Sequence, residues 1–218
     1  MVTGFFGVSE NYIEKVESFT EYLRQDNPRL GTEKVRGGQF VEIPVRQPLS
    51  VMVSDGYAAI GDSAFMTVPL IGSGIANALK AAKILADAVS SDYSNSFSAE
   101  TLWEYQKNYF KAIGASMAPM ACVKLLLTRL EGHELDYIFA KGILNAEDMT
   151  IDADSSSLGA MLSGMSPADI KIKVEGLLNN KAILKKVVNM GLQLGKATAV
   201  TAAMPQKYNR KAILKWVE

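Results

Sequence analysis

The residues with the clearest capacity for chemistry lie between positions 57 and 89. An apolar stretch at 57–60 is followed by Asp62, and Gly72 and Gly74 directly precede a long helical pattern. A carboxylate at the end of a strand stands where ligands collect in layered α/β proteins. Glycines lack a Cβ, so another group can approach their backbone closely. The start of a helix presents free N–H groups and the positive end of its dipole. This combination favours binding of a negatively charged or electron-rich group.

The same segment resembles the second flavin motif of FAD-dependent oxidoreductases with the hydroxybenzoate-hydroxylase fold, in particular geranylgeranyl-reductase-like and FixC-like proteins. That motif reads Gly-Asp-(Ala/Ser)-Ala, four residues, Pro, two residues, Gly-x-Gly, and then Ile, Met or Leu. Every fixed position is matched here, by Gly61, Asp62, Ser63, Ala64, Pro69, Gly72, Gly74 and Ile75, with Ser73 at the variable position. A lone Gly-x-Gly would be weak evidence, whereas matches at this spacing between a predicted strand and a predicted helix are specific. A looser resemblance extends to residues 102–105, which read Leu-Trp-Glu-Tyr, and to residues 208–216.

The resemblance implies a set of FAD-binding residues: Gly61, Asp62, Pro69, Gly72, Ser73, Gly74 and Ile75. Asp62 would accept a hydrogen bond from a ribityl hydroxyl, and the N–H groups of Gly74 and Ile75 would face the pyrimidine carbonyl of the flavin. Preorganised donors of this kind stabilise developing negative charge by about 3 kcal/mol each. The alternative interpretation is an ordinary turn at 61–62 and an ordinary close-packed helix start at 72–74. No residue of the chain is assigned a catalytic role.

The elements that must position this motif follow from hydrophobic periodicity and from Gly and Pro breaks. We expect strands at 2–8, 34–49 and 57–60, and helices at 10–26 and 71–89. After a polar linker at 90–98, further helices are expected at 99–113, 115–131, 133–142, 155–163, 167–178, 180–196 and 209–217. The expected fold is an α+β fragment: a few N-terminal strands and the flavin-binding strand-loop-helix, followed by a mostly α-helical C-terminal region. We interpret 1–50 as a remnant of the substrate and sheet region, 51–95 as the second FAD-binding segment, and 96–218 as a helical C-terminal domain.

The sequence departs from the family pattern near its start. Such enzymes begin with a strand, a Gly-x-Gly-x-x-Gly turn and a helix that hold the FAD diphosphate, and Gly4 and Gly7 are not followed by the third glycine. We therefore expect the chain to be the C-terminal portion of a larger FAD-dependent oxidoreductase. On this interpretation the isolated chain is inactive, and FAD is bound fully only with the missing N-terminal part.

Composition excludes several classes of site. The chain has 218 residues with 23 basic and 23 acidic side chains, and a chain without a basic surplus is not expected to bind nucleic acid. Cys122 is the single cysteine and His133 the single histidine. These counts exclude an internal disulfide and an iron–sulfur cluster and leave no zinc ligand set, so no metal site is expected. We find no signal peptide and no apolar run of about 18 residues, and expect a cytoplasmic protein without a transmembrane segment. Peripheral contact with a membrane stays open.

The expected function is that of an FAD-dependent oxidoreductase reducing isoprenoid or lipid-like double bonds, as the resemblance implies. One alternative is a FixC-like dehydrogenase that passes electrons between a flavoprotein and quinone. The other is a non-catalytic helical module that binds a partner or a lipid. Met117 and Met120 fit core packing, with a lipid-facing groove as the alternative. Trp103 and Tyr105 are expected to anchor the helical tail against the flavin region.

Overall fold

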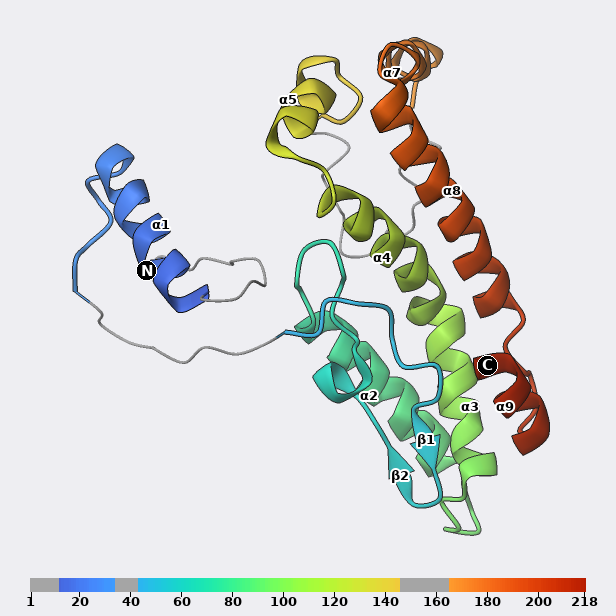
Figure 1. The fold of residues 1–218 in the computed structure, drawn as a ribbon. Helices are drawn as coiled ribbons and strands as arrows, with labels where there is room; N and C mark the ends of the chain where they lie inside the picture. The colour runs from blue at the N-terminus through green and yellow to red at the C-terminus, as the bar shows by residue number, and fades with distance from the viewer. Residues whose placement is uncertain (1–11, 34–42, 146–164) are drawn as a thin grey trace. The chain divides into compact units, whose positions relative to one another are not determined.

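The computed structural model describes residues 12–33, 43–145 and 165–218. The chain divides into two compact units, Met1–Ile43 and Pro44–Glu218, and each is described by itself. In the first unit, helix α1 spans Tyr12–Asp26, which confirms the helix predicted at 10–26 (Figure 1). The predicted strand at 2–8 and the predicted helix at 155–163 lie outside the described residues. The division of the remaining chain near position 95 stays an interpretation.

The second unit contains a short antiparallel hairpin. Strand β1 (Val53–Ser54) pairs with β2 (Tyr57–Ala58), with Val53 opposite Ala58. The two-residue turn between them is Asp-Gly, and Gly56 has a φ of 69°, a left-handed conformation that glycine adopts readily. The strand predicted at 57–60 is therefore confirmed for its first two residues.

The strand predicted at 34–49 is wrong over its described part, because residues 43–49 form no strand. Side chains of a later helix, and not a neighbouring strand, satisfy backbone groups around this segment. The Lys124 ammonium donates to the Val45 carbonyl at 2.7 Å, and the Gln106 amide donates to the Ser50 carbonyl at 2.7 Å. Buried backbone groups need some partner, but that partner need not be a β ladder.

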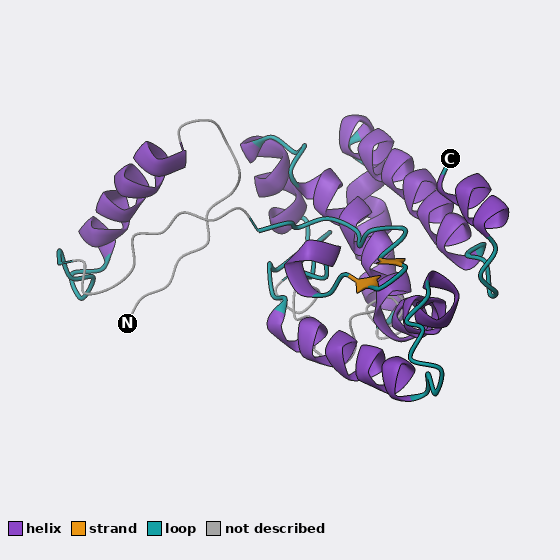
Figure 2. Ribbon diagram, turned by 90° about the horizontal axis from the view of Figure 1, so that it is seen from below, coloured by secondary structure: helices purple, strands orange, loops and turns teal. Residues whose placement is uncertain are grey.

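Helices make up most of the second unit, and Figure 2 shows the two strands as a small pair among them. After the 3-10 turn η1 (Gly61–Ala64) come α2 (Ile75–Ser90), α3 (Ala99–Tyr109), the π-helical turn η2 (Phe110–Gly114), α4 (Ala115–Leu127), α5 (Gly132–Ala140), α7 (Pro167–Leu178), α8 (Lys181–Ala202) and α9 (Arg210–Val217). Four of them begin after a polar N-cap whose side chain accepts a backbone N–H: Ser98, Ser166, Asn180 and Asn209. The described part of the chain is thus mostly helical with a two-stranded antiparallel sheet, which is compatible with an α+β fragment.

The helices predicted at 99–113 and 115–131 are one continuous helix, Ala99–Leu127, joined through η2. By length and composition this helix could cross a bilayer, which differs from our expectation that no segment could. Only 39% of its most apolar 18-residue window is buried inside the protein. A helix in a protein core passes the same test, and Trp103, Tyr105 and Tyr109 are buried in the core here. Length and composition alone therefore do not assign this helix to a membrane.

The main core joins the hairpin to α2, α3 and α4. Tyr105 and Gln106 are fully buried on α3. The Tyr105 hydroxyl donates to the Ala59 carbonyl at 2.8 Å, and burial raises the pKa of this phenol, so it stays a neutral donor. The Gln106 amide accepts from the Met52 N–H at 2.8 Å. These bonds fix the hairpin, and therefore the residues that follow it, against the long helix. The bond from Tyr105 to Ala59 confirms that Tyr105 holds the long helix against the segment just before the predicted flavin motif.

Helix α8 packs alongside α4 (Figure 1). The Trp103 indole donates to the Pro205 carbonyl at 2.9 Å, and the Trp216 indole donates to the Val200 carbonyl at 2.7 Å. Trp103 therefore anchors the segment after α8 and not the flavin region, in contrast to the sequence expectation. Met117 and Met120 are almost completely buried, which confirms their assignment to the core.

Candidate functional site

The predicted flavin motif forms a compact turn directly after the hairpin. Gly61 has a φ of 62° and Phe65 has a φ of 57°, so the backbone is left-handed at both ends of this five-residue turn. The Met66 N–H donates to the Gly61 carbonyl at 3.1 Å and closes this turn. An added Cβ at Gly61 would lie 3.7 Å from Ala78 of α2. The first glycine of the motif is thus needed for its backbone conformation and lies against the helix that ends the motif.

Asp62 and Gly74, which are 12 positions apart in the sequence, meet at Thr67. The Thr67 hydroxyl donates to Asp62 Oδ1 at 2.9 Å, and Thr67 is 1% exposed. A Cβ added to Gly74 would lie 3.0 Å from Thr67 Oγ1 and 3.6 Å from Asp62 Oδ1. The carboxylate of Asp62 is therefore held beside the start of α2, and only glycine fits at position 74 without displacing the threonine.

The loop between these residues is closed by its own backbone. The Val68 N–H donates to the Ser73 carbonyl at 2.8 Å, and the Gly72 N–H donates to the Val68 carbonyl at 2.9 Å. Gly72 has a φ of 68°, a conformation that favours glycine. Pro69 is buried inside this loop, while Ser73 is exposed. The structure therefore brings Gly61, Asp62, Pro69, Gly72, Ser73 and Gly74 together at one end of α2.

The start of α2 is open to a ligand. Gly74 is the N-cap, no side chain of the described residues caps the helix, and its first turn contains no acidic residue. The predicted helix at 71–89 thus begins four residues later than expected, at Ile75. The Ile75 side chain is 80% exposed, and the neighbouring Ile71 and Leu79 are 47% and 67% exposed. Apolar side chains therefore surround a helix terminus whose first N–H groups have no capping side chain.

The residues present fit the FAD contacts that the family resemblance implies, in two respects. Asp62 is exposed, and in the described part of the chain only one of its two carboxylate oxygens receives a hydrogen bond. The N–H groups at the start of α2 can donate to a ligand carbonyl. The glycines distinguish the two interpretations less sharply, because their conformations and contacts would suit an ordinary turn and helix start equally well. The binding roles of all seven motif residues stay predictions.

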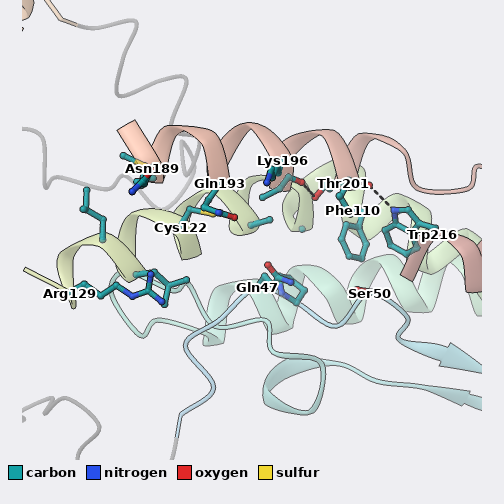
Figure 3. Close-up of a pocket in the computed structure, with 18 of the residues that line it drawn as sticks. Gln47, Ser50, Phe110, Cys122, Arg129, Asn189, Gln193, Lys196, Thr201 and Trp216 are labelled. Carbon is teal, nitrogen blue, oxygen red and sulfur yellow. Dashed lines mark hydrogen bonds between the residues drawn. The ribbon is translucent and has the colours of Figure 1, made fainter. Parts of the chain in front are cut away.

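A second hollow lies between α4, α8, α9 and the segment 47–50, and no residue of the motif lines it. It is a cavity of about 790 Å³, and Figure 3 shows it running from Arg129 and Asn189 at one end to Phe110 and Trp216 at the other. Helix α4 contributes small and apolar side chains, and α8 contributes polar ones along one face. The size lies within the range of small-molecule sites. We call this cavity the α4–α8 groove.

Sequence reasoning missed Thr67 and the α4–α8 groove. Thr67 occupies one of the four variable positions between Ala64 and Pro69, so the pattern itself gives it no weight. The groove forms between segments that are about 70 residues apart in the sequence. Local hydrophobic periodicity does not indicate which distant helices pack together. The polar stripe on α8 was the available signal. Cys122, the single cysteine, is half-buried and lines the groove, and burial raises the pKa of its thiol.

The chain is similar to curated archaeal proteins named digeranylgeranylglycerophospholipid reductase. It is 29% identical to the protein of Sulfolobus acidocaldarius over 174 residues, which are 78% of this chain and 37% of that one. It is 31% identical to the protein of Methanothrix thermoacetophila over 122 residues, 54% of this chain and 29% of that one. With the protein named digeranylgeranylglycerophospholipid reductase 1 of Methanococcoides burtonii it shares 26% identity over 138 residues, 61% and 32% of the two chains.

These similarities confirm the resemblance to geranylgeranyl-reductase-like proteins. No protein-family model matches the chain. The chain spans about a third of the length of the curated relatives it matches. The activity of a whole protein of this kind is therefore a proposal for this chain.

Proposed function

We propose that this chain, similar over about a third of their length to archaeal digeranylgeranylglycerophospholipid reductases, is the flavin-contacting C-terminal part of an FAD-dependent reductase. Its substrate would carry isoprenoid or other lipid-like double bonds, as the names of the relatives suggest. FAD, when bound, supplies the hydride for such a reduction. This chain would contribute contacts to the flavin, and the residues that hold the FAD diphosphate would lie in another part of the protein.

The observation that carries the proposal is the placement of the Asp62 carboxylate beside the open start of α2. Thr67 fixes one carboxylate oxygen from a buried position. The other oxygen is then free to accept from a ligand hydroxyl, while the first N–H groups of α2 are free to donate to a ligand carbonyl. A ligand that offers both a hydroxyl and an electron-rich ring carbonyl could therefore bond to Asp62 and to the start of α2 at once.

The alternatives differ in their support. The names of the relatives concern a geranylgeranylated glycerophospholipid and none of the three mentions a quinone, so we place an isoprenoid substrate ahead of FixC-like electron transfer. The α4–α8 groove gives the helical binding module a specific observation of its own. A binding function of the groove and a flavin contact at the motif are compatible with each other. The cytoplasmic location stays a prediction.

Removal of the Asp62 carboxylate tests the proposal in the protein as its source organism produces it. Asp62→Ala should lower the flavin content after purification and raise the Kd for FAD by about tenfold to 150-fold, because a charged hydrogen bond is worth about 1.5–3 kcal/mol. Asp87→Ala is the matched control, since Asp87 lies on the exposed face of α2 and, among the described residues, pairs only with Lys83. Unchanged flavin content and unchanged reduction of prenyl double bonds in Asp62→Ala would make the motif structural.

A further inference from the structure

Arg46 is a cation without a charged partner beside the flavin motif. The segment that carries it runs along the motif: the Leu49 N–H donates to the Ala64 carbonyl at 3.2 Å, and Val45 Cγ1 would lie 4.0 Å from a Cβ added to Gly72. The Arg46 side chain is exposed, and it forms no ion pair or hydrogen bond with any described residue. Its charge is therefore available to a ligand at the motif.

The ring of Phe65 holds the guanidinium of Arg46. Arg46 Cζ lies 5.1 Å from the centroid of this ring, within the range of a cation–π interaction. Phe65 has a φ of 57°, a left-handed conformation that is uncommon for a bulky residue. Strained backbone of this kind is concentrated at ligand sites, where it positions particular groups. The turn of the motif thus determines where this cation lies.

Two opposite charges at the motif are held by different partners. The Thr67 hydroxyl donates to Asp62, and the Phe65 ring stacks on Arg46. Although Asp62 and Arg46 both lie at the turn 61–65, they form no ion pair with each other. A surface ion pair would stabilise the protein little, so keeping the two groups apart costs little. It leaves an acceptor and a cation open to the same polar ligand.

From this geometry we propose that Arg46 contacts the flavin ring and stabilises the negative charge that the ring gains on reduction. The inference rests on the proposed function, because it requires the flavin to lie at the start of α2. Val45 lies beside Gly72, two positions before the N-cap Gly74, so Arg46 approaches the same end of α2 as the N–H donors. A fixed cation and fixed donors then act on the same developing charge. The diphosphate of FAD is held elsewhere in the proposed complex, which leaves the ring as the anion for Arg46.

The midpoint potential of the bound FAD tests this inference, measured against reference dyes in the protein as its source organism produces it. Arg46→Gln should weaken the binding of reduced FAD at least about tenfold relative to oxidised FAD. For a two-electron couple this corresponds to a fall in potential of about 30 mV or more. Arg46→Lys keeps the charge and should restore part of the potential. Arg129→Gln is the matched control with no expected shift, because Arg129 is an exposed arginine that lines the α4–α8 groove, where no motif residue lies.

Replacement of Phe65 tests whether its ring positions Arg46. Phe65→Leu retains an apolar side chain and removes the aromatic face, so the potential should fall although Arg46 is still present. Phe65→Leu combined with Arg46→Gln should lower the potential no further than Arg46→Gln alone, because the ring acts through the cation. Circular dichroism checks that each variant is folded.

An unchanged potential in Arg46→Gln would overturn the inference. This includes the case in which the variant binds both redox forms of FAD more weakly by the same factor, since Arg46 would then serve the fold or the diphosphate. Asp62→Ala separates this failure from a failure of the proposed function. Loss of flavin in Asp62→Ala beside an unchanged potential in Arg46→Gln would refute the role of Arg46 alone. Full flavin content in Asp62→Ala would refute the flavin contact and this inference with it.

Discussion

At the scale of single residues, Thr67 determines the geometry of the flavin motif. Its hydroxyl bonds to Asp62, and its Oγ1 atom occupies the space that a side chain at position 74 would need. The family pattern identifies Asp62 and Gly74 because they are fixed positions. The pattern gives no information about Thr67, the residue between them that makes Gly74 necessary. Contacts across a loop produce no periodic pattern in the sequence.

Substitution of Gly74 tests this arrangement. Gly74→Ala should lower the free energy of unfolding by about 2 kcal/mol, because the new Cβ would lie 3.0 Å from Thr67 Oγ1 and would have to displace it. Chemical denaturation followed by circular dichroism measures the loss. Gly191→Ala is the matched control: nothing lies within 4 Å of its added Cβ, so this change within α8 should be neutral or stabilising.

A double-mutant cycle identifies Thr67 as the cause. Thr67→Ala should cost about 1 kcal/mol for the lost hydrogen bond to Asp62, and it also makes room at position 74. The double variant Thr67→Ala with Gly74→Ala should therefore cost at least about 0.5 kcal/mol less than the sum of the single variants. Strictly additive losses would mean that the two residues do not interact.

At the scale of elements, the helices were largely predictable and the strands were not. Helices α7 and α9 begin after Ser166 and Asn209, whose capping role is local and visible in the sequence. The segment 43–49 contains the β-branched residues Ile43 and Val45, which suggest a strand, yet it forms none. Helix side chains bond to this segment and to the residues that follow it, through Lys124 and Gln106. Such tertiary contacts override a local preference for extended structure.

The join between α3 and α4 was also missed. A break was expected near Gly114, but the helix continues through a π-helical turn at 110–114. A Cβ at Gly114 would lie 2.9 Å from the Tyr109 ring, so the glycine permits close packing inside the helix and does not end it. Glycine in a helical pattern therefore predicted the right position but the wrong consequence.

Replacement of Gln106 tests how the hairpin is held to the long helix. Gln106→Leu leaves the Met52 N–H and the Ser50 carbonyl without their partner, and a buried unpaired group such as the Met52 N–H costs about 1–3 kcal/mol. We expect the midpoint of urea denaturation to fall clearly. Asn108→Leu on the same helix should change it little, because within the described ranges Asn108 donates only to Glu104. Equal effects of the two variants would contradict the assigned role of Gln106.

At the scale of the whole molecule, the sequence located the candidate flavin site but not the α4–α8 groove. The motif is a contiguous segment, so its fixed spacing can be recognised in the sequence without knowledge of the rest of the fold. The groove needs α4 and α8 to be placed side by side, and that arrangement depends on the pair Lys186–Glu134 and on the tail contacts of Trp103 and Trp216. The relatives are similar over a third of their length, so the activity of the whole protein stays a proposal.

The most direct measurement is an NMR titration of the ¹⁵N-labelled full-length chain with FAD. We predict saturable shifts at the amides of Gly61, Asp62, Gly74 and Ile75, with a Kd near or above about 1 mM because the diphosphate contacts lie elsewhere. The amides of α8 that line the groove should not move. Loss of the shifts in Asp62→Asn, with those shifts retained in Asp87→Asn, would assign them to the motif carboxylate. An absence of shifts at the start of α2 at saturating FAD, or shifts confined to the groove, would contradict the flavin contact.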